Sequence, residues 1–245
     1  MTLATTATAN DILNTVAVEV GLDPQVDAFS ATDRNFVQLR YLINTAVKEL
    51  TRHYNWEFLV TEYNITTVVG DSGIYSLPSD FLRMIDQTGW ERNNRNPING
   101  LSAQEWQYLK GRDLVSETIR VNFRVQSGMF EIYPQPASEA YDINFEYVSK
   151  NCVTSSASAT SVAEISVGAD VPMFDELLLS RMVKVKWYEA KGMDTTKAQD
   201  DFNQMYELLT ASNASSPVLN AGSGSTGIKM LNTVFNLSDT NYGNS

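Results

Sequence analysis

The spacing of apolar residues changes twice along this chain, and that change constrains the fold more than any other feature. Residues 33–53 place apolar side chains every three or four positions, as one face of a helix does. From Trp56 to Val148 the spacing is two, which is typical of half-buried strands. From residue 174 to Leu209 the helical spacing returns. The pattern therefore predicts helices on both sides of an inserted β-rich block.

Two helices are expected before the block and two after it, because residues that favour helix ends flank each apolar stripe. The expected starts and ends are, in chain order, Asn10 and Gly21, then Thr32 or Asp33, then Pro172 and Gly192, then Asp194. The second helix carries His53 on its apolar stripe, where it is expected to be a buried or interface histidine.

Within the block, strands are expected at 56–69, 74–77, 81–90, 119–125, 129–133 and 141–148. Ser127 and Gly128 supply a turn, and residues 93–99 are too polar for anything but a loop. The spacing of Ser102 and Glu105 is that of a capping box, which predicts a short helix carrying Trp106. Residues 151–163 lack charge and have almost nothing to pack, so an extended polar loop is expected.

The fold class that follows is α+β: a four-helix bundle from N- and C-terminal helices, an inserted antiparallel β domain and an extended C-terminal arm. The expected divisions are 1–56 for the first half of the bundle, 57–150 for the β domain, 151–173 for the loop, 174–212 for the second half of the bundle and 213–245 for the arm.

Composition excludes several functional classes. The 245 residues include 18 Lys and Arg against 29 Asp and Glu, a formal net charge of −11, which argues against wrapping nucleic acid. A single cysteine, Cys152, and a single histidine, His53, exclude an internal disulfide and the usual zinc and iron–sulfur ligand sets. No metal or cofactor is expected. No apolar run approaches the length of a membrane span, and no secretory signal is recognisable, so a cytoplasmic origin is expected.

Candidate catalytic groups are weak. Cys152 lies in a Ser/Thr-rich loop and has no second histidine to pair with, so its thiol does not look activated, and His53 has no partner histidine. The GxGxxG letters at residues 222–227 do not follow a strand, so nucleotide binding is not expected. The four tryptophans are spread along the chain, as is typical of residues that anchor a core or an interface. The more specific alternative is a platform on which carbohydrate rings stack. No catalytic residue is assigned.

The helix expected after residue 173 is apolar nearly all the way round. Such a helix is either central in its own bundle or covered by a neighbouring subunit. On the second interpretation, the subunit interface is formed by Leu178, Met182, Val185, Trp187 and Tyr188.

Beyond Ser212 the composition shifts to small polar residues that cannot bury a core of their own. Apolar residues are nevertheless scattered through this arm. They are Val218, Leu219, Ile228, Met230, Leu231, Val234, Phe235, Leu237 and Tyr242.

One segment resembles a known family. The residues YSLPSDFLRMI at 75–85, followed by Trp90, by Pro97-Ile98 and by the capping box, are similar to those of the head-to-tail adaptor (tail tubular protein A-like) proteins of short-tailed bacteriophages. The resemblance covers about residues 33–148. In such proteins Tyr75, Leu77, Pro78 and Phe81 are expected to serve packing.

The resemblance implies a structural virion protein, made in the host cytoplasm. It would form a dodecameric homo-oligomeric ring at the head-to-tail junction, joining the portal protein to a downstream tail or nozzle protein, with tail fibres as a further partner. It also implies that the apolar residues of the arm bind the portal, and that DNA passes through the ring during ejection without specific binding.

Two other functions remain open from the residues alone. A tail receptor- or fibre-docking module is favoured by the β block and the neutral loop at 151–163. A carbohydrate-active tail enzyme is favoured only by the aromatic content and the available carboxylates.

Overall fold

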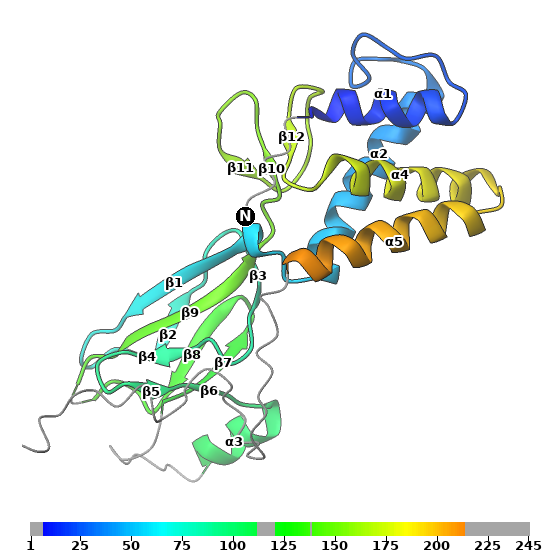
Figure 1. Ribbon diagram of the computed structural model, residues 1–245. Coiled ribbons are helices and arrows are strands. Elements are labelled where there is room, and N and C mark those ends of the chain that lie inside the picture. The colour runs from blue at the N-terminus through cyan, green and yellow to red at the C-terminus, as the bar shows by residue number, and fades with distance from the viewer. Residues whose placement is uncertain (1–6, 112–120, 138, 214–245) are drawn as a thin grey trace, which may run out of the picture. The chain divides into compact units, whose positions relative to one another are not determined.

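The computed structural model describes residues 7–111, 121–137 and 139–213, which all lie in one compact unit of the chain, Met1–Asn213. This part is α+β, as expected, with mostly antiparallel sheets (Figure 1). Its α-helices are α1 (Ala9–Glu19), α2 (Arg34–His53), α3 (Ala103–Gly111), α4 (Glu176–Lys191) and α5 (Thr196–Asn213). A short 3-10 helix, η1 (Glu57–Leu59), follows α2.

The N-cap of helix α1 lies two residues before the expected Asn10. This cap is Thr8, whose hydroxyl accepts a hydrogen bond from the Asp11 N–H while the Asp11 carboxylate accepts one from the Thr8 N–H. The expected cap, Asn10, instead holds the following loop: its amide donates to the Val26 carbonyl and accepts from the Ala28 N–H. The helix stops before Gly21, which has a φ of +80°.

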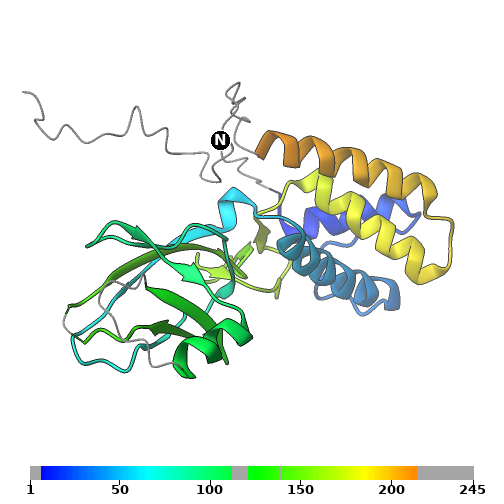
Figure 2. The same cartoon turned by 90° about the horizontal axis from the view of Figure 1, so that it is seen from below.

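Helix α4 is central among the helices. It packs against α1, α2 and α5, and Figure 2 shows these four helices gathered together. Its cap is Asp175, which accepts hydrogen bonds from two N–H groups of the first turn, and Gly192 ends it with a φ of +68°. Pro172, the expected first-turn residue, lies in a strand instead.

The four helices share one hydrophobic core. Fully buried side chains of α1, α2 and α4 meet there with Leu209 of α5, while Phe202 and Met205 of α5 pack at its border. Asp33 precedes α2 as expected but makes no side-chain cap hydrogen bond. His53 ends α2 as an exposed residue, so it is not a core histidine, and the alternative of an interface histidine stays a prediction.

The β part contains two sheets (Figure 1). The first has the order β1-β9-β4-β5, with β3 also paired to β9, and the second has the order β2-β8-β7-β6. Their strands are β1 (Val60–Thr66), β2 (Ile74–Ser76), β3 (Phe81–Met84), β4 (Trp90–Glu91), β5 (Asn96–Pro97), β6 (Asn99–Gly100), β7 (Asn122–Gln126), β8 (Met129–Tyr133) and β9 (Asp142–Ser149).

Several expected strands differ in extent. The segment 81–90 is interrupted between β3 and β4, where Gln87 has a φ of +64°. Residues 93–99, expected to be a loop, contribute β5 and the first residue of β6, and β6 pairs with β7 in parallel. Residues 119 and 120 of another expected strand lie outside the described residues. The Ser127–Gly128 turn is confirmed: both residues have positive φ, as a two-residue hairpin requires.

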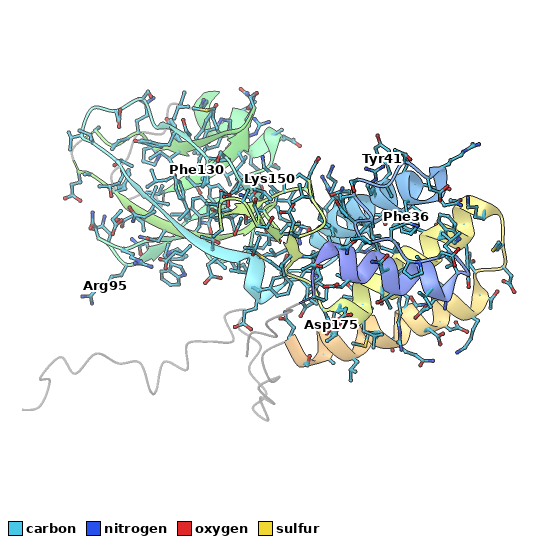
Figure 3. All side chains as sticks on the ribbon, turned by 90° about the horizontal axis from the view of Figure 1, so that it is seen from above. Phe36, Tyr41, Arg95, Phe130, Lys150 and Asp175 are labelled. Carbon is cyan, nitrogen blue, oxygen red and sulfur yellow. The ribbon has the colours of Figure 1, made fainter. Side chains whose placement is uncertain are left out.

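A second core lies within the β part. Phe123, Phe130 and Phe145 stack in a row, with ring centroids 4.9 and 5.1 Å apart. Ile65, Ile132 and Ile143 are buried beside them. Figure 3 labels a buried aromatic side chain in each core, Phe36 among the helices and Phe130 among the strands.

Residues 151–173 are not the unpacked loop expected from their composition. They form a small sheet of strands β10 (Val153–Thr154), β11 (Ser161–Val162) and β12 (Val171–Pro172), in the order β11-β10-β12. Cys152, Val153 and Ile165 are buried in the helical core. The Asn44 side chain of α2 also exchanges two hydrogen bonds with the backbone of Ile165. Few apolar residues are enough here because only a few side chains of the segment enter the helical core.

Asp170 organises this segment. Its carboxylate, fully buried, accepts five hydrogen bonds at 2.9–3.1 Å from Ser156, Ser166 and Val167. Burial raises the pKa of Asp170, but these hydrogen bonds outweigh burial and bring it down to about 2. The backbone carbonyls of Asp170 and Gly168 also accept the first two N–H groups of α1. One carboxylate thus fixes the loop that receives the start of α1.

We expect Asp170→Asn to lower the free energy of unfolding by about 1–3 kcal/mol at pH 7, because an amide cannot accept all five hydrogen bonds. The folded-state pKa of Asp170 is depressed, so its stabilisation is present above the ordinary pKa of 3.8 and is lost as the pH falls toward 2. Urea denaturation at pH 7 and pH 3 measures both effects. The difference between wild type and variant should be smaller at pH 3.

The matched control is Asp200→Asn, which removes an exposed carboxylate on α5 and should change the free energy of unfolding by less than about 0.5 kcal/mol. An equal loss in the two variants would contradict the role assigned to Asp170.

Candidate functional site

The segment that carries the family resemblance, residues 75–90, lies where the two cores meet. Tyr75, Leu77, Phe81 and Met84 pack against the core of the β part. Leu82 and Ile85, from the same segment, pack against the helical core. The packing role expected for Tyr75, Leu77 and Phe81 agrees with these contacts, and the Pro78 carbonyl accepts the Phe81 N–H at 3.0 Å in the turn that leads into β3. This junction segment belongs to both cores.

Arg83 of β3 binds the end of α2. Its guanidinium donates to the carbonyls of Thr51 and Tyr54, at 3.4 and 2.9 Å, and twice to the side-chain oxygen of Asn55. Carbonyls at a helix C-terminus lack partners within the helix and carry partial negative charge, which a cation stabilises. Burial lowers the pKa of Arg83, and the nearby charge of Arg52 lowers it further.

Asp80 fixes the other end of the junction segment to β9. Its carboxylate accepts hydrogen bonds from the Tyr147 hydroxyl at 3.1 Å and the Ser149 hydroxyl at 2.7 Å. Burial raises the pKa of Tyr147 to about 12, with a further contribution from the charge of Asp80. The Phe81 ring stacks on Tyr147, with centroids 5.6 Å apart. Asp80 and Arg83 therefore attach β3 to the central strand and to the helix end at once.

Sequence reasoning did not assign roles to Asp80 and Arg83. The available signal was their type and position: one acid and one base stand among apolar residues in a segment where the family resemblance is strongest.

The residues predicted to form a subunit interface are covered within the subunit. Leu178, Met182, Val185 and Trp187 are at most 7% exposed, and Tyr188 packs at the border of the helical core. The Lys191 ammonium lies 4.2 Å from the centre of a Trp187 ring. Within one subunit α1, α2 and α5 therefore bury four of the five side chains, which agrees with the other interpretation of the apolar helix, while Tyr188 stays partly exposed.

All nine arm residues predicted to bind the portal lie outside the described residues, as does the glycine-rich stretch at 222–227.

The candidate chemical groups are not assembled for catalysis in the described ranges. Cys152 is 1% exposed, and burial raises the pKa of its thiol, which disfavours the nucleophilic thiolate. His53 is exposed, whereas Cys152 is buried. No cluster of three metal-ligating side chains occurs among the residues that the structure describes.

A hollow of about 290 Å³ lies between η1, α4 and α5. Trp56, Phe58 and Phe174 line it, together with the acids Glu57 and Asp175. Figure 3 labels Asp175 at the start of α4, where its carboxylate is already engaged in capping. The hollow therefore offers aromatic surface rather than a pair of free carboxylates at which hydrolysis would proceed.

Comparison with known proteins gives one result for almost the whole chain. The model of the family described as SU10 adaptor protein matches residues 7–222. The match spans both cores, the junction segment and the segment held by Asp170. A search of the curated proteins found no match. Within the described ranges, no helix has the length and apolar character needed to cross a membrane.

We expect Arg83→Ala to lower the free energy of unfolding by about 2–3 kcal/mol, because the carbonyls at the end of α2 lose a charged donor at a partly buried site. Arg83→Lys should recover only part of this loss, since an ammonium cannot reproduce the planar contacts of the guanidinium. Chemical denaturation measures both. Arg34→Ala, at an exposed arginine in the first turn of α2, is the control and should be close to neutral. Equal stability of the Ala and Lys variants would contradict the geometry.

We expect Trp187→Ala to lower the free energy of unfolding by about 3–5 kcal/mol, as truncation of a core tryptophan does. Tyr41→Ala is the matched control, because Tyr41 is an aromatic residue of α2 that is 74% exposed and lies on the outer side of the helices (Figure 3). Its substitution should change the free energy by less than about 0.5 kcal/mol. If Trp187→Ala kept full stability and lost only assembly, Trp187 would be an interface residue after all.

Proposed function

This chain belongs to the SU10 adaptor protein family, and from that premise we propose that it is a subunit of a phage head-to-tail adaptor. The observation that carries the proposal is the extent of the family match, which includes both cores and the junction between them. Membership confirms the resemblance drawn from the sequence. On this proposal the chain is a structural component of the virion and not an enzyme.

The assembly that we propose is a ring of twelve copies between the portal and a downstream tail or nozzle protein. In each copy, α1, α2, α4 and α5 act as a four-helix bundle, and Arg83 and Asp80 hold the β part to it. A subunit that transmits load between two neighbours needs such a connection, since an unsupported linker between two cores bends easily. The paired hydrogen bonds of the junction segment support this role.

The contacts between copies would lie on outer faces of the helices. The residues first considered, on α4, are buried within the subunit. Large apolar side chains are instead exposed elsewhere: Val18 of α1 is 61% exposed, and Tyr41 of α2 is 74% exposed. Neighbouring copies that covered such side chains would remove them from water.

The charge of the chain suits a conduit for DNA. Each copy carries a formal net charge of −11, so twelve copies would carry −132. A surface with the same sign of charge as DNA lets the polymer pass without adhesion. The proposed channel therefore conducts DNA and has no specific DNA site.

We further propose that the arm, residues 213–245, binds the portal through its apolar residues. Its support is compositional: the arm carries spaced apolar side chains in a segment that is otherwise small and polar. Apolar side chains are the usual anchors of a polar segment that binds a partner's groove.

The test uses the full chain and portal-bearing heads. Val234→Ser, Phe235→Ser and Leu237→Ser together should reduce attachment to heads more than tenfold, because three anchors at about 1 kcal/mol each exceed the 1.4 kcal/mol of a tenfold change. Co-sedimentation with heads and electron microscopy measure attachment. The stability of residues 7–213 should not change.

The control is Ser223→Ala with Ser225→Ala, which alters the same arm without removing an apolar residue. Full attachment of the triple variant would show that the arm is not the portal contact. Failure of the wild-type chain to attach to heads would contradict the adaptor proposal itself.

A further inference from the structure

Strand β1 has a free edge. It pairs with β9 over seven residues, and no other strand of the described ranges pairs with it. Figure 1 shows β1 at the border of its sheet. The other border strands of the described part span four residues or fewer, so β1 is the longest edge available there.

The register identifies which backbone groups of β1 point outward. The Thr67 N–H donates to the Tyr141 carbonyl at 2.9 Å, and the register pairs Ile65 with Ile143 and Tyr63 with Phe145. Because hydrogen-bonded pairs alternate along an antiparallel ladder, the odd-numbered residues of β1 exchange bonds with β9. The backbone N–H and C=O groups of Glu62, Asn64 and Thr66 point away from β9.

The opposite side of β9 confirms this alternation. Its even-numbered residues bond toward the other neighbours: the Asp142 carbonyl accepts the Arg92 N–H at 2.8 Å, and the Glu146 carbonyl accepts the Ile85 N–H at 2.9 Å. At the start of β1 the Val60 N–H is satisfied by the Glu57 carbonyl. The outward groups of β1 are thus three N–H donors and four carbonyl acceptors.

This edge has little of the usual protection. Proline, a bulge, lysine and short length commonly blunt an edge strand, and β1 has none of these; its charged side chain is Glu62, which is paired with Arg92. Just beyond its Thr66 end, two aliphatic side chains remain largely exposed: Val68 at 65% and Val69 at 51%. Free backbone groups next to exposed aliphatic side chains are what an added strand would cover.

The outer face beside this edge is acidic. Glu62 stands directly opposite Glu146 in the register, and Asp142 lies on the same face, where it accepts a hydrogen bond from the Asn64 amide. Arg92 forms an ion pair with Glu62, and no ion pair of Glu146 or Asp142 occurs among the described residues. Like charges opposite one another destabilise a sheet, so a basic side chain on an added strand would be favoured here.

We propose that the β1 edge is a docking site for an extended segment of another virion protein. That segment would pair with Glu62, Asn64 and Thr66, place a basic side chain beside Glu62, and cover the aliphatic side chains beyond Thr66. A different protein is favoured over a second copy because the free edge of similar length in a second copy is its own β1, which would bring Glu62 and the same acidic face against this one. The inference rests on the proposed function, which places the chain in a virion.

Hydrogen exchange at single residues tests the proposal. In the purified full chain, the amides of Glu62, Asn64 and Thr66 should exchange at least about tenfold faster than those of Thr61, Tyr63 and Ile65. In purified virions, labelled intact and then dissociated for mass spectrometry, the three edge amides should slow by about tenfold or more. The odd-numbered amides are the internal reference.

Each other outcome overturns the inference in a distinguishable way. Fast exchange of the edge amides in virions that contain the chain would show that nothing docks on β1, and the proposed function would stand. Slow exchange already in the purified chain would show that the occupant is part of this chain or a second copy. Absence of the chain from virions would overturn the proposed function as well.

A pair of threonine variants adds a second measurement. Thr66→Pro removes an outward N–H and no bond to β9, so the variant should fold normally but enter virions at least about tenfold less. Thr61→Pro removes a ladder bond to β9 and should instead impair folding. Normal incorporation of folded Thr66→Pro would contradict the docking site. If Thr66→Pro failed to fold, the exchange measurement would still decide.

Discussion

The contact between Arg83 and the end of α2 is the interaction on which the arrangement of this subunit depends. A β part inserted between helices needs a physical attachment beyond the chain itself, because two separate cores joined only by linkers move independently. Arg83 supplies it by donating to the last carbonyls of α2, while Leu82 and Ile85 from the same segment enter the helical core. Asp80 then ties the segment to the central strand β9. One short strand therefore belongs to both cores.

The return of the chain to the helices depends on a second polar group. Asp170 gathers Ser156, Ser166 and Val167 around one buried carboxylate, and the loop so formed receives the first N–H groups of α1. The N-terminal helix is thereby linked to a segment more than 150 positions later in the chain. The chain passes from helices to strands near Arg83 and returns to the helices near Asp170. Each of these charged side chains makes several hydrogen bonds, and such hydrogen bonds have strict geometric requirements.

A structural role is consistent with where the polar and apolar groups are placed. The single cysteine is buried, the single histidine is exposed, and the carboxylates of Asp170 and Asp194, whose pKa values are lowered, accept backbone hydrogen bonds. What the described surface offers a partner is of another kind: an open strand edge and exposed aliphatic and aromatic side chains. These features suit permanent protein contacts, which agrees with an adaptor in a multi-protein junction.

The sequence by itself determined the order of helices, strands and helices, the capping box at Ser102 and the Ser127–Gly128 turn, because period and turn chemistry are local properties. It also pointed to the family through the junction segment. Only the tertiary structure showed that the apolar side chains of α4 are largely buried by other helices of the same chain. The sequence shows that these side chains avoid water, but not whether the residues that cover them belong to the same chain or to a neighbouring subunit. The tertiary structure likewise decided that residues 151–173 pack and that Asp170 and Arg83 are hubs. Their partners lie far away in sequence, and a hydrogen bond between distant residues leaves no periodic signal.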